Sequence, residues 1–316
     1  MDTILVTGCA GFIGSHTTEA LLNRGKKVVG IDNFDPYYSR EIKEKNLSSF
    51  INHNNFVFSE IDITQKDSLK NLPQDIDKVI HLAAKAGVRP SIEDPEGYIN
   101  TNINGTRNIL AWMLHRNIKK LVFASSSSVY GENKKLPFAE TDNVDFPISP
   151  YAFTKKANEL MNYTWHHLYD MDMINLRFFT VYGPRQRPDL AICKFAGKIS
   201  NNEPIHIYGD GTTGRDYTYI DDIVQGILAS LHYVGQKDKV YEIINLGNSS
   251  PVQLNHLVDT IYKLMGKEKN IIHDPMQPGD VSYTYADITK AKELLNYHPG
   301  TSMEDGLRKF LDWQKG

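Results

Sequence analysis

The chain has 316 residues, of which 41% are hydrophobic and 23% charged, and its formal net charge is −3. This composition is that of an ordinary globular protein, and the charge gives no support for a nucleic acid or a membrane as a partner. The two cysteines, Cys9 and Cys193, make neither a disulfide framework nor a metal cluster, and no apolar run approaches the ~20 residues of a membrane span. The 11 histidines show no ligand spacing, so we expect no metal. The N-terminus runs directly into a predicted strand, so we expect no signal peptide and a cytoplasmic location.

Strand-like and helix-like segments alternate through the first half of the chain. The expected strands are residues 3–7, 27–31, 55–60, 78–82, 120–125 and 173–178. The expected helices follow Gly14 and lie around residues 99–116 and 151–169. This alternation predicts an α/β fold with a Rossmann-type doubly wound parallel sheet and helices on both faces.

The second half has shorter mixed segments separated by turns. A helix is expected at residues 219–232, a strand end at 245–247, and helices at 254–265 and 303–314. Because no linker or repeat separates the halves, we expect a smaller C-terminal α/β lobe interleaved with the first. We assign residues 1–178 to the larger lobe, with a return at 217–247, and residues 179–216 and 248–316 to the smaller lobe.

The most informative motif is a glycine triplet directly after the first strand. Gly8 permits a tight turn, Gly11 lets backbone N–H groups approach a pyrophosphate at a helix N-terminus, and Gly14 lets the helix pack closely on the sheet. Asp32 ends the second strand, near the expected spacing of about 20 residues, where a carboxylate accepts hydrogen bonds from ribose hydroxyls. Asn33, and not an arginine, follows it, so the motif favours NAD over NADP.

A tyrosine and a lysine one helical turn apart provide the strongest catalytic signal. Tyr151 and Lys155 share a helix face at spacing i, i+4, and a run of serines, 125–128, ends the strand upstream. The reference pKa of a tyrosine is near 10, which is too high for a base at pH 7. A nearby ammonium and the positive nicotinamide ring would favour the phenolate, which could then remove a hydroxyl proton as hydride leaves the same carbon.

These motifs together resemble the extended short-chain dehydrogenase/reductase family, and the resemblance covers essentially the whole chain. Several stretches are similar to UDP-glucuronate 4-epimerases within that family, namely residues 86–89, 125–131, 151–160, 178–184, 187–189 and 276–281. The resemblance implies that Tyr151 is the base, Lys155 its partner and ribose ligand, and Ser126 the assisting hydroxyl. It also implies a homodimer formed through helices near 99–116 and 151–169.

The resemblance further implies two sets of binding residues. The NAD set comprises Gly8, Gly11, Phe12, Ile13, Gly14, Asp32, Asn33, Asp62, Ile63, Leu82, Ala83, Ala84, Asn102, Tyr151, Lys155 and Phe178. The UDP-sugar set comprises Arg89, Ser126, Ser127, Ser128, Thr180, Arg187, Arg215, Gln277 and Asp280. Gln277 departs from the arginine that many galactose-type epimerases carry before the Pro-Gly-Asp stretch, which weakens phosphate attraction there.

The residues after the assisting hydroxyl restrict the reaction. Related dehydratases carry Asp-Glu at this place and related decarboxylases carry Glu in this region, whereas this chain has Ser127 and Ser128. What remains is 4-epimerisation of a UDP-sugar through a 4-keto intermediate, with no net redox change. Arg187 could hold a substrate carboxylate, which favours UDP-glucuronate as substrate and UDP-galacturonate as product, with a role in polysaccharide biosynthesis. A UDP-glucose or UDP-N-acetylglucosamine 4-epimerase, a UDP-glucuronate decarboxylase and a non-catalytic NAD-binding protein remain alternatives.

Overall fold

The computed structural model describes residues 2–275 and 283–315. A seven-stranded parallel sheet lies at its centre, in the order β11-β6-β5-β4-β1-β2-β3. The strands are β1 (Thr3–Thr7), β2 (Lys27–Asp32), β3 (Phe56–Glu60), β4 (Lys78–His81), β5 (Lys120–Ser126), β6 (Asp172–Phe178) and β11 (Tyr241–Leu246). Strands β1 and β6 are buried along their whole length, as expected for parallel strands covered on both faces. The chain direction across the sheet reverses between β1 and β4, where ligands bind in such folds.

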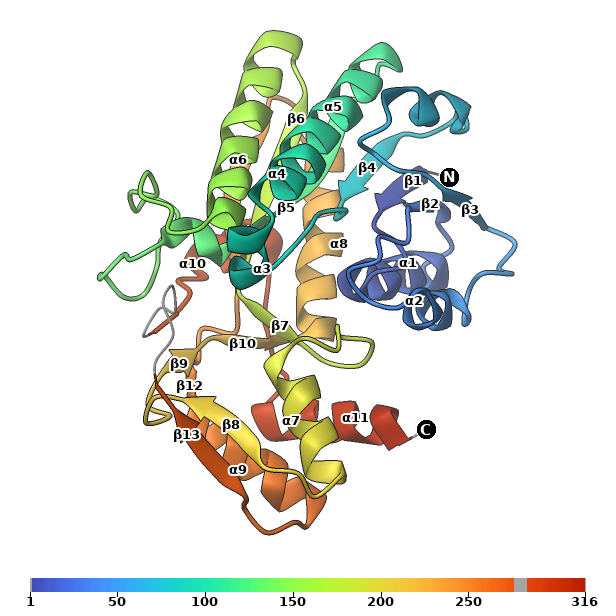
Figure 1. Cartoon of the computed structure of the whole chain (residues 1–316). Helices are drawn as coiled ribbons and strands as arrows, with labels where there is room; N and C mark the ends of the chain where they lie inside the picture. The colour runs from blue at the N-terminus through green and yellow to red at the C-terminus, as the bar shows by residue number, and fades with distance from the viewer. Residues whose placement is uncertain (1, 276–282, 316) are drawn as a thin grey trace.

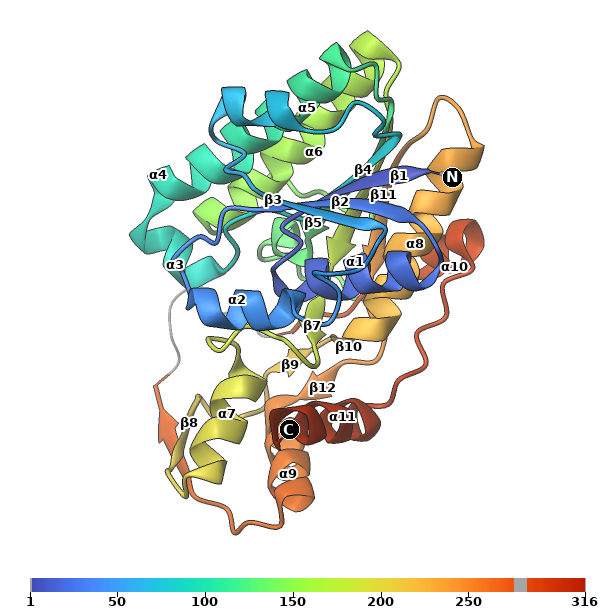
Figure 2. The ribbon, with the colours of Figure 1, turned by 90° about the vertical axis from the view of Figure 1, so that its right-hand side faces the viewer.

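Helices cover both faces of the sheet, as Figure 2 shows. One layer contains α1 (Phe12–Asn23), α2 (Arg40–Leu47) and α8 (Ile220–Gln236), with α10 (Thr289–Leu295) packed on α8. The other layer contains α3 (Val88–Glu93), α4 (Pro95–Tyr98), the π-helical segment η2 (Ile99–Gly105), α5 (Thr106–His115) and α6 (Pro150–Tyr169). Two short 3₁₀ turns, η1 (Lys66–Asn71) and η3 (Ser127–Tyr130), follow β3 and β5.

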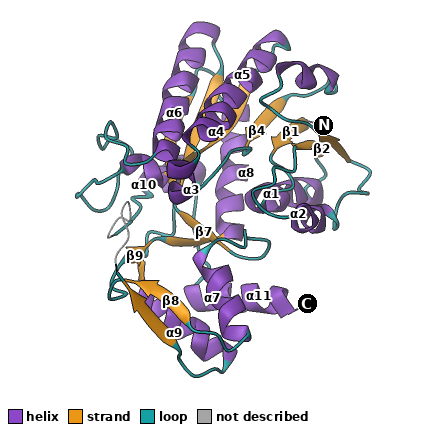
Figure 3. Cartoon of the chain, in the orientation of Figure 1, coloured by secondary structure: helices purple, strands orange, loops and turns teal. Residues whose placement is uncertain are grey.

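A smaller lobe lies beyond the sheet, at the bottom of Figures 1 and 3. Its strands form three short pairs: β7 (Thr180–Tyr182) with β10 (Tyr217–Tyr219), β8 (Ile205–Tyr208) with β13 (Ile271–Asp274), and β9 (Gly214–Arg215) with β12 (Val252–Gln253). Its helices are α7 (Ala191–Ser200), α9 (Leu254–Met265) and α11 (Met303–Lys315), and α9 packs against the other two. The chain leaves the large sheet at β6 and returns to it through α8 and β11.

The predicted fold class is confirmed, but some element boundaries differ from prediction. The helix expected over 99–116 begins as the wider π-helical segment η2, whose sequence INTNING is rich in asparagine and ends in glycine, both poor helix formers. The short strand pairs of the smaller lobe were not predicted, since strands of two to four residues carry no measurable periodicity. Within residues 2–275 and 283–315, every helix is too short or too polar to span a bilayer.

Candidate active site

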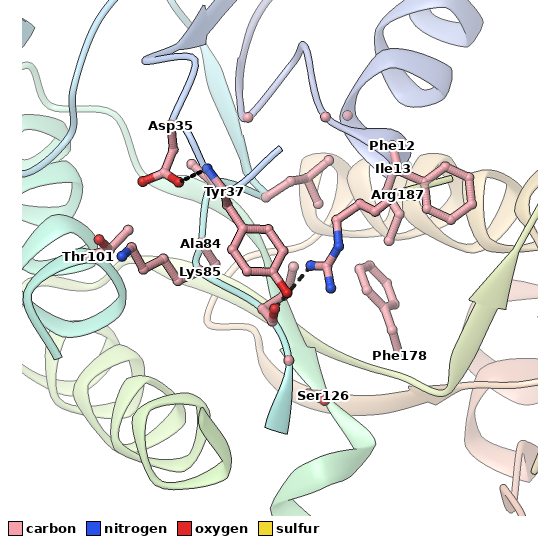
Figure 4. Close-up of a pocket in the computed structure, with 18 of the residues that line it drawn as sticks. Phe12, Ile13, Asp35, Tyr37, Ala84, Lys85, Thr101, Ser126, Phe178 and Arg187 are labelled. Atoms are coloured by element: carbon pink, nitrogen blue, oxygen red, sulfur yellow. Dashed lines mark hydrogen bonds between the residues drawn. The ribbon is translucent and has the colours of Figure 1, made fainter. Parts of the chain in front are cut away.

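A cavity of about 520 Å³ lies at the carboxyl ends of the central strands, a volume typical of ligand sites. Its wall is formed by the glycine loop after β1, by the ends of β2, β4 and β5, by the start of α6 and by residues 178–190 of the chain. Figure 4 shows Phe12 and Ile13 of α1, Phe178 at the end of β6, and Arg187 of the smaller lobe on this cavity. Segments of both lobes therefore build one site.

The glycine loop has the backbone shape that a dinucleotide requires. Gly8 adopts φ +72°, and a Cβ atom on it would lie 2.9 Å from the backbone nitrogen of Ala83. A Cβ atom on Gly14 would lie only 1.9 Å from the carbonyl oxygen of Gly8, so nothing larger than glycine lets α1 pack here. Gly11 caps the N-terminus of α1 and lines the cavity. Exposed amides at a helix N-terminus form an anion site, so the loop fits the pyrophosphate of NAD.

Asp32 is fixed at the carboxyl end of β2. It is only 8% exposed, and its carboxylate accepts hydrogen bonds from the backbone nitrogens of Ala10 (3.2 Å) and Phe34 (2.9 Å). Burial raises the pKa of this carboxyl, and the charge of Lys43, whose Nζ lies 3.9 Å away, opposes that rise. The carboxylate thus faces the cavity in a held orientation, as a ribose ligand must.

The start of α6 positions the predicted base. Ser149 caps this helix by accepting a hydrogen bond from the Ala152 nitrogen at 3.1 Å, which places Tyr151 in the first turn at the cavity wall. One turn later, Lys155 is buried and its Nζ donates to the carbonyl oxygen of Ala124 at 2.7 Å. The Lys155 Nζ lies 5.9 Å from the centroid of the Tyr151 ring.

Burial governs the electrostatics of Tyr151 and Lys155. Burial raises the pKa of Tyr151, while its contact with Ser126 and the charge of Arg187 lower it. Burial also lowers the pKa of Lys155 to about 7, against the opposing charge of Glu159. Desolvation therefore dominates at both groups, and the lysine alone does not create a phenolate. A further cation or a ligand hydrogen bond has to supply the missing stabilisation.

The serine run forms one wall of the cavity. Ser126, Ser127 and Ser128 all line it, and the Ser126 hydroxyl both accepts a hydrogen bond from the Ser128 nitrogen (3.1 Å) and donates to the Ser128 hydroxyl (3.2 Å). These bonds fold the chain into η3 directly after β5. The wall thus presents hydroxyl groups and no carboxylate.

Arg187 faces this cavity from the smaller lobe with all of its nitrogens engaged. Its Nε and Nη2 each lie 2.9 Å from a carboxylate oxygen of Asp189, and its Nη1 donates to the Ala86 carbonyl at 3.1 Å. The Tyr37 hydroxyl donates to Asp189 at 3.2 Å. The guanidinium lies 5.2 Å from the Tyr37 ring centroid, and Figure 4 shows the Arg187 side chain beside this ring. The loop is also held by His16, whose Nε2 donates to the Pro184 carbonyl at 2.9 Å.

Most of the predicted site residues come together at this cavity. Those that line it are Gly8, Gly11, Phe12, Ile13, Gly14, Asp32, Asn33, Ile63, Leu82, Ala83, Ala84, Ser126, Ser127, Ser128, Tyr151, Lys155, Phe178, Thr180 and Arg187. Four predicted residues do not line it: Asp62, Asn102, Arg89 and Arg215. Gln277 and Asp280 lie outside the described residues.

The four residues away from the wall have other contacts. Asp62 accepts hydrogen bonds from Asn33 Nδ2 (3.3 Å) and from the Thr64 nitrogen (2.8 Å). Asn102 is buried and bonds to both backbone polar groups of Lys85, so it shapes the loop after β4. The Arg89 guanidinium lies 4.8 Å from the ring centroid of Tyr208, and Arg215 Nη1 donates to the Gly214 carbonyl at 2.9 Å.

Sequence reasoning missed several residues of the wall. Tyr37, Tyr38 and Lys43 follow β2, and Tyr98 and Thr101 come from α4 and η2. The paired tyrosines stand a few residues after Asp32, so their closeness to the ribose-binding strand end is the one signal that could have found them. Within the described residues, no group of three His, Cys, Asp or Glu side chains is arranged to hold a metal.

Comparisons with known proteins agree with this geometry. The family model described as GDP-mannose 4,6 dehydratase matches residues 5–310. The chain is 46% identical over 318 residues to the UDP-glucuronate 4-epimerase of Thermodesulfobacterium geofontis, covering 100% of this chain and 97% of that protein. The structure of UDP-glucuronic acid 4-epimerase from Bacillus cereus in complex with UDP-glucuronic acid and NAD is 40% identical, with a TM-score of 0.93 and coverage of 99% of both chains. The UDP-glucose 4-epimerase of Thermotoga maritima with UDP-glucose is 33% identical, with a TM-score of 0.89 and coverage of 99% of this chain and 98% of that chain.

The family model matches nearly the whole chain. The glycine loop and the Tyr151–Lys155 pair also lie together in one cavity. The chain belongs to the GDP-mannose 4,6-dehydratase family, within the extended short-chain dehydrogenases/reductases.

Proposed function

We propose that this protein is an NAD-dependent UDP-glucuronate 4-epimerase, which interconverts UDP-glucuronate and UDP-galacturonate. The observation that carries the proposal is the cavity itself, which joins a dinucleotide loop, a Tyr-Lys pair, a wall of serines and an arginine. The relatives named UDP-glucuronate 4-epimerase and the Bacillus cereus structure with UDP-glucuronic acid and NAD support it.

The proposed chemistry starts and ends at C4 of the sugar. Tyr151 takes the proton of the C4 hydroxyl, Ser126 hydrogen-bonds the same oxygen, and Lys155 supports the phenolate. When bound, NAD would supply the acceptor for the hydride that leaves C4 and, once reduced, the donor that returns it. The 4-keto sugar then turns within the cavity, so that hydrogen returns to the opposite face and Tyr151 returns the proton to the oxygen. No carboxylate of the serine wall is available for elimination of water.

The residues on the cavity fit NAD. The glycine loop would hold the pyrophosphate, Asp32 a ribose, and the apolar side chains of Ile61 and Ile63 the adenine. The larger lobe, residues 1–178 with the return at 217–247, would hold NAD, and the remainder would hold the UDP-sugar. Asp62 and Asn102 would act through the loops that they order. Arg89 of α3, together with Arg215, Gln277 and Asp280 of the smaller lobe, would hold the UDP part.

Substrate choice is proposed to depend on Arg187. Once C4 is a ketone, glucuronate is a β-keto acid that readily loses carbon dioxide. Loss of carbon dioxide discharges the carboxylate, so a cationic, hydrogen-bonded pocket opposes it. Arg187, together with the hydroxyls of Ser127, Ser128 and Thr180 on the same wall, offers such a pocket.

The nearest alternative substrates are UDP-glucose and UDP-N-acetylglucosamine, and structural neighbours bind or act on them. NMR analysis of the products formed from each of the three UDP-sugars distinguishes them, and carbon dioxide release would indicate a decarboxylase. In the variant Arg187→Ala, turnover of UDP-glucuronate is expected to fall at least tenfold, the usual effect of losing a charged hydrogen bond. Unchanged turnover would remove Arg187 from the proposal.

A homodimer is proposed through the outer face of α6 and the neighbouring segment. Phe153, Leu160, Tyr163 and Leu168 of α6 are 45%, 57%, 53% and 59% exposed, and Ile99 beside them in the same layer is 40% exposed. Several exposed large apolar side chains on one helix favour an interaction surface, and two copies of it would pack as four helices. The variant Leu160→Glu should run as a monomer in sedimentation analysis. A cytoplasmic location stays a prediction.

A further inference from the structure

Three consecutive residues at the end of β5 each contact one of three side chains on α6. The helix side chains are spaced four residues apart, so they face the strand from one side of the helix. From strand to helix, the pairs are Ala124 with Lys155 (2.7 Å), Ser125 with Glu159 (2.6 Å), and Ser126 with Tyr151. Two of these pairs contain the proposed catalytic groups, and the pair of Ser125 with Glu159 has no role in the chemistry described above.

Glu159 belongs to a fully buried ion pair with Arg177 of β6. Both side chains are 1% exposed, and Arg177 Nε and Nη2 each donate to a Glu159 oxygen at 2.9 Å. Arg177 stands opposite Ser125 in the β5–β6 register, so the carboxylate is held between two neighbouring strands. Taking two charges out of water is costly, and apolar side chains of equal volume often replace such a pair without loss of stability. Stability alone is therefore a weak explanation for it.

We infer that Glu159 is a positioning residue for the epimerase reaction, which fixes the end of β5 against α6 through Ser125 and keeps the neighbouring Lys155 ammonium charged. This inference rests on the proposed function only for the role of Tyr151 as base. It extends the reacting pair by one helical turn, to a group that does not line the cavity.

The charges around Lys155 support this role. Burial lowers the pKa of Lys155 to about 7, and Glu159 is the group that opposes this effect. On β4, His81 is neutral at physiological pH, because burial lowers its pKa to about 3. Tyr151 on α6 carries no charge until it gives up its proton, and Arg177 on β6 is positive. Without the Glu159 carboxylate, the effect of burial on the Lys155 ammonium would be unopposed, and Lys155 would lose its proton at lower pH.

The test compares the titration of Lys155 in three proteins, followed by NMR of lysine labelled with carbon-13 at Cε. In Glu159→Gln, which keeps the size and the acceptor for Ser125, the titration midpoint of Lys155 should fall by about 1 pH unit or more. The matched control is Asp172→Asn, which breaks the Lys120–Asp172 pair (2.8 Å) at the opposite ends of the same two strands. The control should leave the midpoint unchanged, and an unchanged midpoint in Glu159→Gln would overturn the inference.

A double variant guards against misfolding caused by the unpaired arginine. In Glu159→Gln/Arg177→Met the midpoint should still fall, but by less, because no extra cation remains. The pH profile of kcat, measured with whichever UDP-sugar the wild type turns over, should lose height in both variants. Its alkaline limb, where Lys155 loses its proton, should move to lower pH. A loss of height with no movement of the limb would mean that the pair serves packing only. The NMR titration needs no turnover, so failure of the proposed substrate is seen separately.

Discussion

Arg187 and Asp189 form a two-point ion pair at the cavity, with both nitrogen–oxygen distances at 2.9 Å. The arginine that is proposed to hold the substrate carboxylate is thus already matched by a carboxylate of its own loop. A UDP-sugar with a carboxylate at C6 has to compete with Asp189 for the same fork of donors. The strength of this internal pair therefore tunes affinity for UDP-glucuronate.

The variant Asp189→Asn tests that competition. It preserves the size of the side chain but removes the competing charge, so the KM for UDP-glucuronate should fall about tenfold. The KM for UDP-glucose, which has no carboxylate, serves as the internal control and should change little. Steady-state kinetics with both sugars measure the ratio. Equal changes for the two sugars would mean that the pair only shapes the loop.

The variant Tyr151→Phe removes the proposed base while it keeps the ring. We expect kcat to fall by about 10²- to 10⁴-fold, the usual contribution of a positioned acid–base group. The NAD content of the purified protein, read from the absorbance of the released nucleotide, should stay at the wild-type level. Substantial remaining activity would assign the proton transfer to another group.

Gly14→Ala tests the fit of the dinucleotide loop. The added Cβ would lie 1.9 Å from the Gly8 carbonyl, so α1 and the loop must separate and NAD binding should be lost. Gly197→Ala is the matched control, because a Cβ there meets nothing within 4 Å, and a helical Gly→Ala change stabilises by roughly 0.5–1 kcal/mol. NAD content and Tm check both variants. Full NAD content in Gly14→Ala would contradict the close packing.

Lys155 should leave a signature in the pH dependence of stability. Its pKa in the folded protein, about 7, lies below the ordinary value of 10.5, so between these values the unfolded chain binds more protons and stability rises with pH. Relative to Lys155→Met, the wild type should gain up to about 1.4 kcal/mol of unfolding free energy per pH unit in this window. Urea unfolding at pH 7, 8 and 9 measures the difference. Parallel curves for the two proteins would mean that Lys155 titrates normally.

The sequence predicted those parts of the site that are local in the chain. The Gly8–Gly14 stretch and the Tyr151–Lys155 pair each occupy a few consecutive residues, where spacing alone fixes their relation. The pair of Glu159 with Arg177 and the contact of Tyr37 with Asp189 join distant segments, and no local pattern indicates them. The pKa of Tyr151 is a related case. Its rise comes from burial by the fold, and spacing cannot report burial.

The proposed reaction requires that the hydride taken from C4 stays in the protein and is given back to the same carbon. The direct measurement is NMR of the product formed from UDP-glucuronate deuterated at C4, in ordinary water and with no added NAD. We expect UDP-galacturonate that keeps the deuterium at C4, with no net NADH and no carbon dioxide. Loss of the label to water, accumulation of NADH, or absence of the 4-epimer would contradict it.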